Sequence, residues 1–286
     1  MHPVLQKILP RIYGTTYNLT ALVHPRLAAK WSYTTFCTIR RGGINGQQAK
    51  FLSTAEVTFR IMEDLKIMEY RWPGEGDTVI LVHGWESNSG RWRKLIQMLA
   101  EKNFNIIAFD APGHGNSNGK ILNVILYAKC LEVLIQTHKP KHVVGHSVGG
   151  MTTIYNEYKN PSQHIEKIVT TGAPSEFYEV MEEFQSILGL NSRVMKAFDE
   201  LVLEKFGFRM KEFSSSFFVA TNTKKGLLVH DREDPVAPYH GSEQVHKAWK
   251  NSKLISTIGY GHSLHQEKVN RAIVDFLLEN ETDNYM

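Results

Sequence analysis

The spacing of apolar and polar residues predicts strands alternating with helices over most of the chain. Residues 55–61 and 66–72 alternate apolar and polar positions, as half-buried strands do, and Glu63-Asp64 forms the turn of an antiparallel hairpin between them. Apolar runs predict further, more deeply buried strands at 78–82, 105–109, 142–145, 165–170, 226–229 and 253–258. Helical spacing appears at 90–102, 120–138, 151–158, 242–250 and 265–279. This order predicts a mostly parallel sheet with helices on both faces.

An inserted segment, residues 174–223, breaks the alternation. It carries two apolar stripes at helical spacing, Phe177, Met181, Phe184, Ile187 and Leu188, followed by Val194, Phe198, Leu201 and Val202. Two or three helices between two sheet strands predict a lid. We therefore expect a core domain of residues 55–173 and 224–286 with a helical lid insertion at 174–223.

Residues 1–54 are expected to form an N-terminal helical extension. Helical spacing links Val4, Leu5, Ile8, Leu9 and Ile12, although Pro10 interrupts this run, and residues 21–31 offer a second short helix before a loop at 40–48. Basic residues are interleaved with the apolar ones at Lys7, Arg11, Arg26 and Lys30. We expect a helix pair packed on the main domain or across a homodimer, and the alternative is peripheral contact of residues 1–31 with anionic lipid.

Composition narrows the function class. The chain has 286 residues, 42% of them hydrophobic and 22% charged, with a formal net charge of +4 that gives no reason to expect nucleic acid as a partner. Cys37 and Cys130 have neither metal-site nor redox-motif spacing, so we expect reduced thiols in a cytoplasmic protein. No stretch approaches the roughly 20 apolar residues of a membrane span, and the N-terminus lacks the pattern of a signal peptide.

The sequence around Ser147 predicts a nucleophile at a sharp turn between a strand and a helix. Ser147 is the centre of a G-x-S-x-G pattern, with an apolar run before it and a helical run after it. A serine in so tight a turn takes a strained backbone with positive φ, and side chains at Gly145 and Gly149 would clash with neighbouring chain segments. The helix N-terminus also favours developing negative charge at this point.

A serine nucleophile needs a base and an acid, and both are expected at the same edge of the sheet. The strand at 226–229 leads into residues 230–238, which contain three carboxylates, and the strand at 253–258 leads into Gly261-His262-Ser263. The chain order is therefore serine, acid, histidine. That order is associated with α/β-hydrolases and differs from those of the trypsin-like and subtilisin-like proteases.

Residues 55–280 resemble the α/β-hydrolase family. The resemblance rests on five motifs at the ends of five expected strands: His83-Gly84-Trp85, the run from Phe109 to Ser117 (FDAPGHGNS), Gly145-His146-Ser147-Val148-Gly149-Gly150, the run from Asp231 to Pro238, and Gly261-His262-Ser263. It implies an eight-stranded α/β-hydrolase fold with a helical lid.

The resemblance implies a role for individual residues. Ser147 matches the nucleophile, His262 the base and Asp234 the acid; the alternatives Asp231 and Glu233 are expected to be solvated turn residues, and His265 a surface or capping residue. The backbone N–H groups of Val148 and Trp85 match the oxyanion hole. Asp110, His114 and His146 are expected to support the structure.

These residues fit acyl transfer to water without a metal or other cofactor. A serine at the elbow argues against the family's epoxide hydrolases and haloalkane dehalogenases, which use aspartate, and the 13 histidines show no H-E-x-x-H pattern. We expect hydrolysis of a carboxylic ester of a small or medium apolar substrate. The alternatives are a thioesterase, lysophospholipase, carbon–carbon bond hydrolase or cofactor-free perhydrolase, a membrane-associated lipid hydrolase, and a non-enzymatic ligand-binding member of the fold. Substrate contacts are expected from Phe177, Met181, Phe184 and Phe198.

Overall fold

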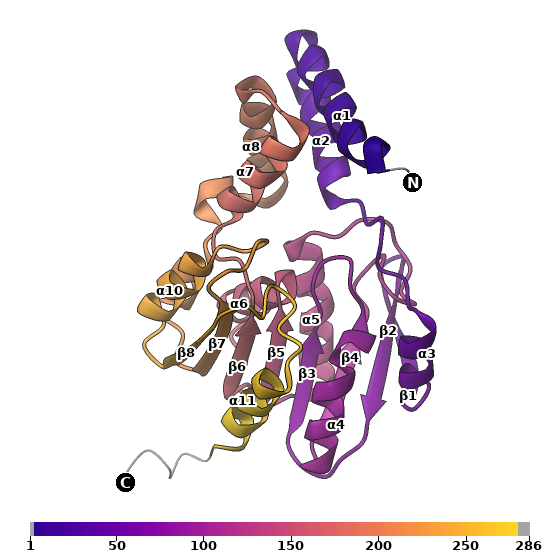
Figure 1. Cartoon of the computed structure of the whole chain (residues 1–286), viewed down its shortest axis with the longest axis vertical. Helices are drawn as coiled ribbons and strands as arrows, with labels where there is room; N and C mark the ends of the chain where they lie inside the picture. Colours follow the sequence, from indigo (N-terminus) through magenta and orange to yellow (C-terminus); the bar gives the residue numbers. More distant parts are fainter. Residues whose placement is uncertain (1–2, 280–286) are drawn as a thin grey trace. The chain divides into compact units, whose positions relative to one another are not determined.

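The computed structural model describes residues 3–279, with side chains from Ile8 onward (Figure 1). The chain forms two compact units. One comprises the chain up to Thr38 together with Glu176–Ser214, and the other comprises Ile39–Ser175 together with the chain from Ser215 on. We call them the helical unit and the sheet unit.

The sheet unit contains one eight-stranded sheet, which confirms the expected fold class. Its strands are β1 (Glu56–Met62), β2 (Leu65–Trp72), β3 (Thr78–Val82), β4 (Asn105–Phe109), β5 (His142–His146), β6 (Lys167–Thr171), β7 (Lys225–Asp231) and β8 (Ser252–Thr257). They lie in the order β1-β2-β4-β3-β5-β6-β7-β8. β2 is antiparallel to both of its neighbours and all other pairs are parallel. The carboxyl ends of β3, β5, β6, β7 and β8 therefore meet at one edge.

Helices cover both faces of this sheet (Figure 1). Successive strand residues point to opposite faces. Val79 and Leu81 of β3 and Val144 of β5 belong to an apolar cluster with α4 (Arg93–Glu101) and α11 (Glu267–Leu278). On the other face, α5 (Val124–His138) packs on α6 (Val148–Lys159). The shorter α3 (Gly46–Leu52), η1 (Ser89–Trp92), α9 (Ser215–Val219) and α10 (Tyr239–Ala248) complete the unit.

Capping sets the start of one helix and of one 3₁₀ turn. The run expected at 120–138 becomes helical only at Val124, because the side chain of Asn123 accepts a hydrogen bond from the N–H of Leu126. The helix expected at 90–102 begins as a 3₁₀ turn, in which the Asn88 side chain accepts from the N–H of Gly90.

The helical unit consists of α1 (Pro3–Val23), α2 (Pro25–Cys37), α7 (Phe177–Leu188) and α8 (Ser192–Phe206), followed by η2 (Met210–Glu212). Pro10 lies inside α1 without ending it. The break falls instead at His24, because Pro25 has no N–H and disfavours helical backbone in the residue before it. The expected single run at 21–31 is therefore wrong. The side chains of Val4, Leu5 and Lys7 lie outside the described part. No helix among residues 3–279 is both long and apolar enough to cross a membrane.

Helices α1 and α2 share a core with the inserted helices α7 and α8. The structure therefore groups these segments in one unit, whereas the sequence predicts a separate N-terminal extension and lid. The aromatic ring of Phe36 on α2 lies 5.1 Å from that of Phe184 and 6.4 Å from that of Phe198, between ring centroids. Residues 39–54 and 215–223 belong to the sheet unit. The pair α1 and α2 and the pair α7 and α8 pack against each other, and the four helices bury one shared apolar core.

We predict that Gly14→Ala destabilises the helical unit. A Cβ at Gly14 would lie 1.8 Å from the carbonyl oxygen of Leu188, so α1 and α7 must separate. Overpacking of this kind costs about 1–3 kcal/mol, whereas alanine is favoured over glycine by about 1 kcal/mol in an open helix. Denaturant unfolding monitored by circular dichroism measures the net change.

Gly43→Ala is the control for this substitution, because a Cβ there meets nothing within 4 Å. It should leave the stability unchanged or slightly raised. If the Gly14→Ala protein is as stable as the wild type, α1 and α7 do not pack as closely at Gly14 and Leu188 as the structure shows.

Candidate active site

Ser147 occupies the sharp turn between β5 and α6, as its sequence predicts. Its φ is +54° and its ψ is −125°, and its N–H donates to the carbonyl of Thr171 on β6. A Cβ on Gly145 would lie 2.6 Å from the carbonyl oxygen of Gly149, and one on Gly149 would lie 2.3 Å from that of Val82. Both glycines are therefore required by the close approach of β3, β5 and α6, which confirms the expected clashes.

The structure brings Ser147, His262 and Asp234 into one hydrogen-bonded chain. His262 Nε2 lies 2.9 Å from Ser147 Oγ, and His262 Nδ1 lies 2.8 Å from Asp234 Oδ2. The side chain of His262 is 18% exposed, whereas that of Asp234 is fully buried. This arrangement lets the imidazole take a proton from the serine while the carboxylate holds its Nδ1–H.

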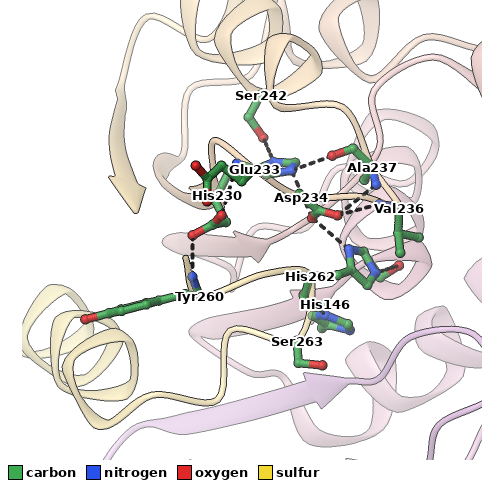
Figure 2. A network of polar contacts seen from close by, with 12 residues as sticks. His146, His230, Glu233, Asp234, Val236, Ala237, Ser242, Tyr260, His262 and Ser263 are labelled. Atoms are coloured by element: carbon green, nitrogen blue, oxygen red, sulfur yellow. Dashed lines mark hydrogen bonds and ion pairs between the residues drawn. The ribbon is translucent and has the colours of Figure 1, made fainter. Parts of the chain in front are cut away.

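Asp234 is held from several sides (Figure 2). Its Oδ1 accepts from the backbone N–H groups of Val236 and Ala237, at 2.8 and 3.0 Å. Its Oδ2 also lies 3.3 Å from Nε2 of the buried His230. Burial by itself would raise the pKa of Asp234, but the hydrogen bonds from His230, His262 and the two N–H groups bring it well below its ordinary value. The acid is therefore ionised when the site works.

His230 is a second histidine on the acid, and sequence reasoning gave it no role. Its Nε2 donates to the carbonyl of Ala237 at 2.9 Å, and its Nδ1 lies 2.6 Å from Ser242 Oγ on α10. It thereby ties the acid loop to β7 and to α10 (Figure 2). The sequence shows that His230 comes four residues before Asp234. It does not show that the intervening turn brings the His230 ring against the Asp234 carboxylate.

Asp231 is a buried residue, so its expected place as a solvated turn residue is wrong. It accepts from Thr257 Oγ1 at 2.7 Å, from the N–H of Tyr260 at 2.8 Å and from the N–H of Glu233 at 3.0 Å. Burial opposes the charge, yet these donors lower the pKa of Asp231 below its ordinary value. It fastens the end of β7 to the loop that carries His262. Glu233 is exposed, as expected.

Two further side chains hold the backbone of the histidine loop. His146 Nε2 lies 2.9 Å from the carbonyl oxygen of His262, and Arg91 Nη2 lies 2.9 Å from that of Ser263. Because a carbonyl only accepts, His146 carries its proton on Nε2. Burial, and then the nearby charge of Arg91, keep the pKa of His146 well below its ordinary value, so the ring is neutral. The expected supporting role of His146 thus gains a specific partner, the loop that carries His262.

The loop after β3 lies against the elbow, where the oxyanion hole is expected. A Cβ on Gly84 would lie 3.1 Å from Cβ of Ser147. His83 accepts from the N–H of Ala111 through Nε2 at 2.9 Å and donates from Nδ1 to the carbonyl of Gly84 at 2.7 Å. His114 Nε2 accepts from the N–H of Glu86 at 3.1 Å. Two buried imidazoles thus fix the backbone on both sides of Trp85.

Val148 begins α6, so its N–H belongs to the first turn, which has no carbonyl partner within the helix. The N–H groups of Val148 and Trp85 remain our prediction for the oxyanion donors.

Asp110 has the supporting role expected of it. Its Oδ1 accepts from the N–H and the hydroxyl of Ser89, both at 2.8 Å, and its Oδ2 accepts from Tyr70 Oη and the N–H of Asn116, both at 2.9 Å. A buried carboxylate with four donors organises the loops after β3 and β4. His265, the rival to His262, is exposed and precedes α11 by one residue, Gln266.

The residues expected to contact substrate lie in the helical unit. Met181, Phe184 and Phe198 are 1%, 9% and 0% exposed and share its apolar core. Phe177 is only partly buried and lies 6.0 Å from Phe36, between ring centroids. These contacts give all four side chains a packing role, and contact with a substrate stays a prediction.

The site geometry agrees with what the sequence resembles among known proteins. The sequence profile described as "alpha/beta hydrolase fold" matches residues 77–210, and the profile described as "TAP-like protein" matches residues 213–285. The chain belongs to the α/β-hydrolase fold family.

Several curated proteins that match this chain are named as esterases. The pimeloyl-(acyl-carrier protein) methyl ester esterase of Nitrosospira multiformis is 31% identical over 150 residues, which are 49% of this chain and 54% of that protein. The enzyme of the same name from Vibrio vulnificus is 27% identical over 151 residues, 51% of this chain and 54% of that protein. The chain thus spans about half the length of the curated relatives it matches.

Solved structures share the hydrolase fold at lower identity. Est1E from Butyrivibrio proteoclasticus, solved with ferulic acid, is 20% identical with a TM-score of 0.63 and covers 77% of this chain and 98% of its own. The esterase EaEST from Exiguobacterium antarcticum is 17% identical with a TM-score of 0.62 and covers 78% of this chain and 100% of its own. At these identities the likeness shows the fold.

We predict that replacing Asp234 and Asp231 by asparagine in this protein has different effects. Asp234→Asn should keep the fold but lower turnover by about 10⁴-fold, as expected when the base loses the carboxylate that fixes its tautomer. Asp231→Asn places an amide NH₂ against buried donors, which costs about 1–3 kcal/mol of stability, and should change turnover much less. Steady-state kinetics and thermal melting of both variants test this assignment, and the opposite ranking of turnover would make Asp231 the acid.

A second prediction concerns His146. Its N–H bond to the His262 carbonyl is a neutral hydrogen bond worth about 0.5–1.5 kcal/mol, so His146→Leu should lower kcat about two- to tenfold with little change in KM. His146→Gln keeps an N–H donor and should recover part of the loss. If both variants keep wild-type kcat and only melt at a lower temperature, His146 supports the fold and does not position the base.

Proposed function

We propose that this protein is a serine hydrolase that cleaves a carboxylic ester through an acyl-enzyme. The observation that supports this best is the unbroken chain from Ser147 Oγ through His262 to the buried, ionised Asp234. Ser147 attacks the ester carbonyl carbon while His262 Nε2 takes its proton. The same proton then goes to the leaving alcohol. Water, deprotonated by His262, releases the acid and restores the serine.

The oxyanion formed at each step is stabilised in this proposal by the N–H groups of Val148 and Trp85. The position of Val148 in the first turn of α6 supports this, because the helix dipole favours negative charge there. The fixed backbone around Trp85, held through His83 and His114, supports the second donor. Donors held rigid before the reaction need no reorganisation in the transition state.

The substrate in this proposal is a small or medium acyl ester. The relatives with matching sequence are named methyl ester esterases of a pimeloyl group carried on acyl-carrier protein, which supports an ester over a carbon–carbon bond. A thioester would use the same residues. Parallel assays of matched esters and thioesters of two to twelve acyl carbons distinguish the two, and ester hydrolysis should be the faster at every length.

We place this activity in the cytoplasm. The support is that Cys37 and Cys130 are both buried, free thiols, and that burial raises their pKa to about 12, which keeps them protonated. Of the two partners weighed for the N-terminal helices, we favour a membrane surface over a second copy of the chain, because α1 and α2 carry no acidic residue.

We predict that a fluorophosphonate probe labels Ser147 and that Ser147→Ala abolishes labelling. The reason is that, among the residues the structure describes, only this serine combines a positive φ with a histidine 2.9 Å from its hydroxyl. Peptide mapping by mass spectrometry locates the adduct. Ser263→Ala is the control, because Ser263 adjoins His262 in sequence while His262 Nε2 contacts Ser147 Oγ, and this variant should label normally. An adduct on any other serine would refute the nucleophile.

A further inference from the structure

Helix α1 has two apolar faces, and only one of them is packed. The inner face contains Gly14, Tyr17 and Ala21, all buried. Beside them, Asn18 donates to the carbonyl of Gly189 at 2.8 Å and accepts from the N–H of Asn191 at 2.8 Å. This face therefore fixes the rotation of α1 about its axis within the helical unit.

The opposite side of α1 presents large apolar side chains to solvent. Its members are Ile8, Ile12, Leu19, Leu22 and Val23, which are 50%, 54%, 62%, 61% and 73% exposed. Their spacing of three, four and seven residues places them on one stripe, which we call the outer stripe. At 1.5 Å per residue it is about 22 Å long. The exposed Thr15 lies within the stripe, between Ile12 and Leu19, and the other side chains of the stripe are large and apolar. An exposed apolar stripe on a helix marks an interaction surface.

The side chains around the outer stripe suit an interface between water and lipid. Thr16 and Thr20 donate their hydroxyls to the carbonyls of Ile12 and Thr16 in their own helix, at 2.9 Å each, so they need no water partner. Tyr13 and Trp31 are both 41% exposed, but their rings lie 6.1 and 6.3 Å from the ring of Tyr17 on the inner face, so they do not border the outer stripe.

Charge indicates which lipids the outer stripe would meet. None of the chain's 29 Asp and Glu residues comes before Glu56, so both N-terminal helices carry only basic charges. Arg26 is used in an ion pair with Glu204, whereas Arg11 and Lys30 are exposed. Basic residues beside an apolar stripe attract the anionic headgroups of lipids.

We propose that the outer stripe of α1 lies in the surface of an anionic lipid bilayer and docks the enzyme there. A second copy of the chain fits this surface less well. A two-fold contact would bring the like charges of two α1 helices together, and one stripe of five side chains falls short of the roughly 20–30 residues a side of a stable interface. The proposal goes beyond ester hydrolysis and does not depend on it, because the stripe lies on α1 and uses none of Ser147, His262 and Asp234.

Vesicle flotation of the full chain tests this docking. The probes are liposomes of phosphatidylcholine alone and liposomes with a third of phosphatidylglycerol. The wild type should float with the anionic liposomes and less with the neutral ones, and binding should weaken as salt is raised. Leu19→Ser/Leu22→Ser should bind at least about tenfold more weakly, since it removes two inserted side chains. It should keep the melting temperature and the turnover of a soluble short-chain ester.

Ile187→Ser/Leu203→Ser is the matched control. These residues are 48% and 37% exposed on α7 and α8 and are not part of the outer stripe, so their replacement should leave flotation unchanged. Ser147→Ala should float like the wild type, which separates docking from catalysis. The proposal is overturned if the wild type does not float, if the leucine pair has no effect, or if light scattering shows a dimer that the leucine pair dissociates.

Discussion

The close approach of β3, β5 and the first turn of α6 is the constraint on which the rest of the active site depends. Gly145 and Gly149 permit this approach because any side chain would enter neighbouring backbone. The approach forces Ser147 into a positive φ, which costs on the order of 1–3 kcal/mol and is tolerated only where the surroundings fix it. The N–H of Ser147, donated to Thr171 of the next strand, is part of that fixation.

From this turn, a set of buried polar side chains positions the loops that carry His262 and Asp234. His146 and Arg91 hold two successive carbonyls of the loop with His262, and Asp231 ties the end of β7 to the same loop. His230 holds the loop with Asp234. His83 and His114 act in the same way beside Trp85. The three loops come from the ends of different strands, and loop backbone has few partners of its own. Imidazole and carboxylate side chains supply those partners in this structure.

The helical unit depends on a different kind of interaction, apolar contact between distant parts of the chain. Phe36 from the N-terminal segment lies among Phe177, Phe184 and Phe198 from the insertion. The inserted helices therefore need the first 38 residues to complete their core. The inner face of α1 packs against α7, whereas the outer stripe is exposed. The bilayer proposal rests on this exposed apolar surface.

The sequence by itself determined the sheet, the order of its strands along the chain, and the residues Ser147 and His262. Buried strands and a G-x-S-x-G turn leave local patterns, because side-chain periodicity and glycine requirements act within a few residues. Only the tertiary structure decided that Asp231 is buried, that His230 and Arg91 support the catalytic loops, and that residues 1–38 pack with 176–214. Those outcomes depend on contacts between segments far apart in the chain, and single residue types do not encode which distant partner they will meet.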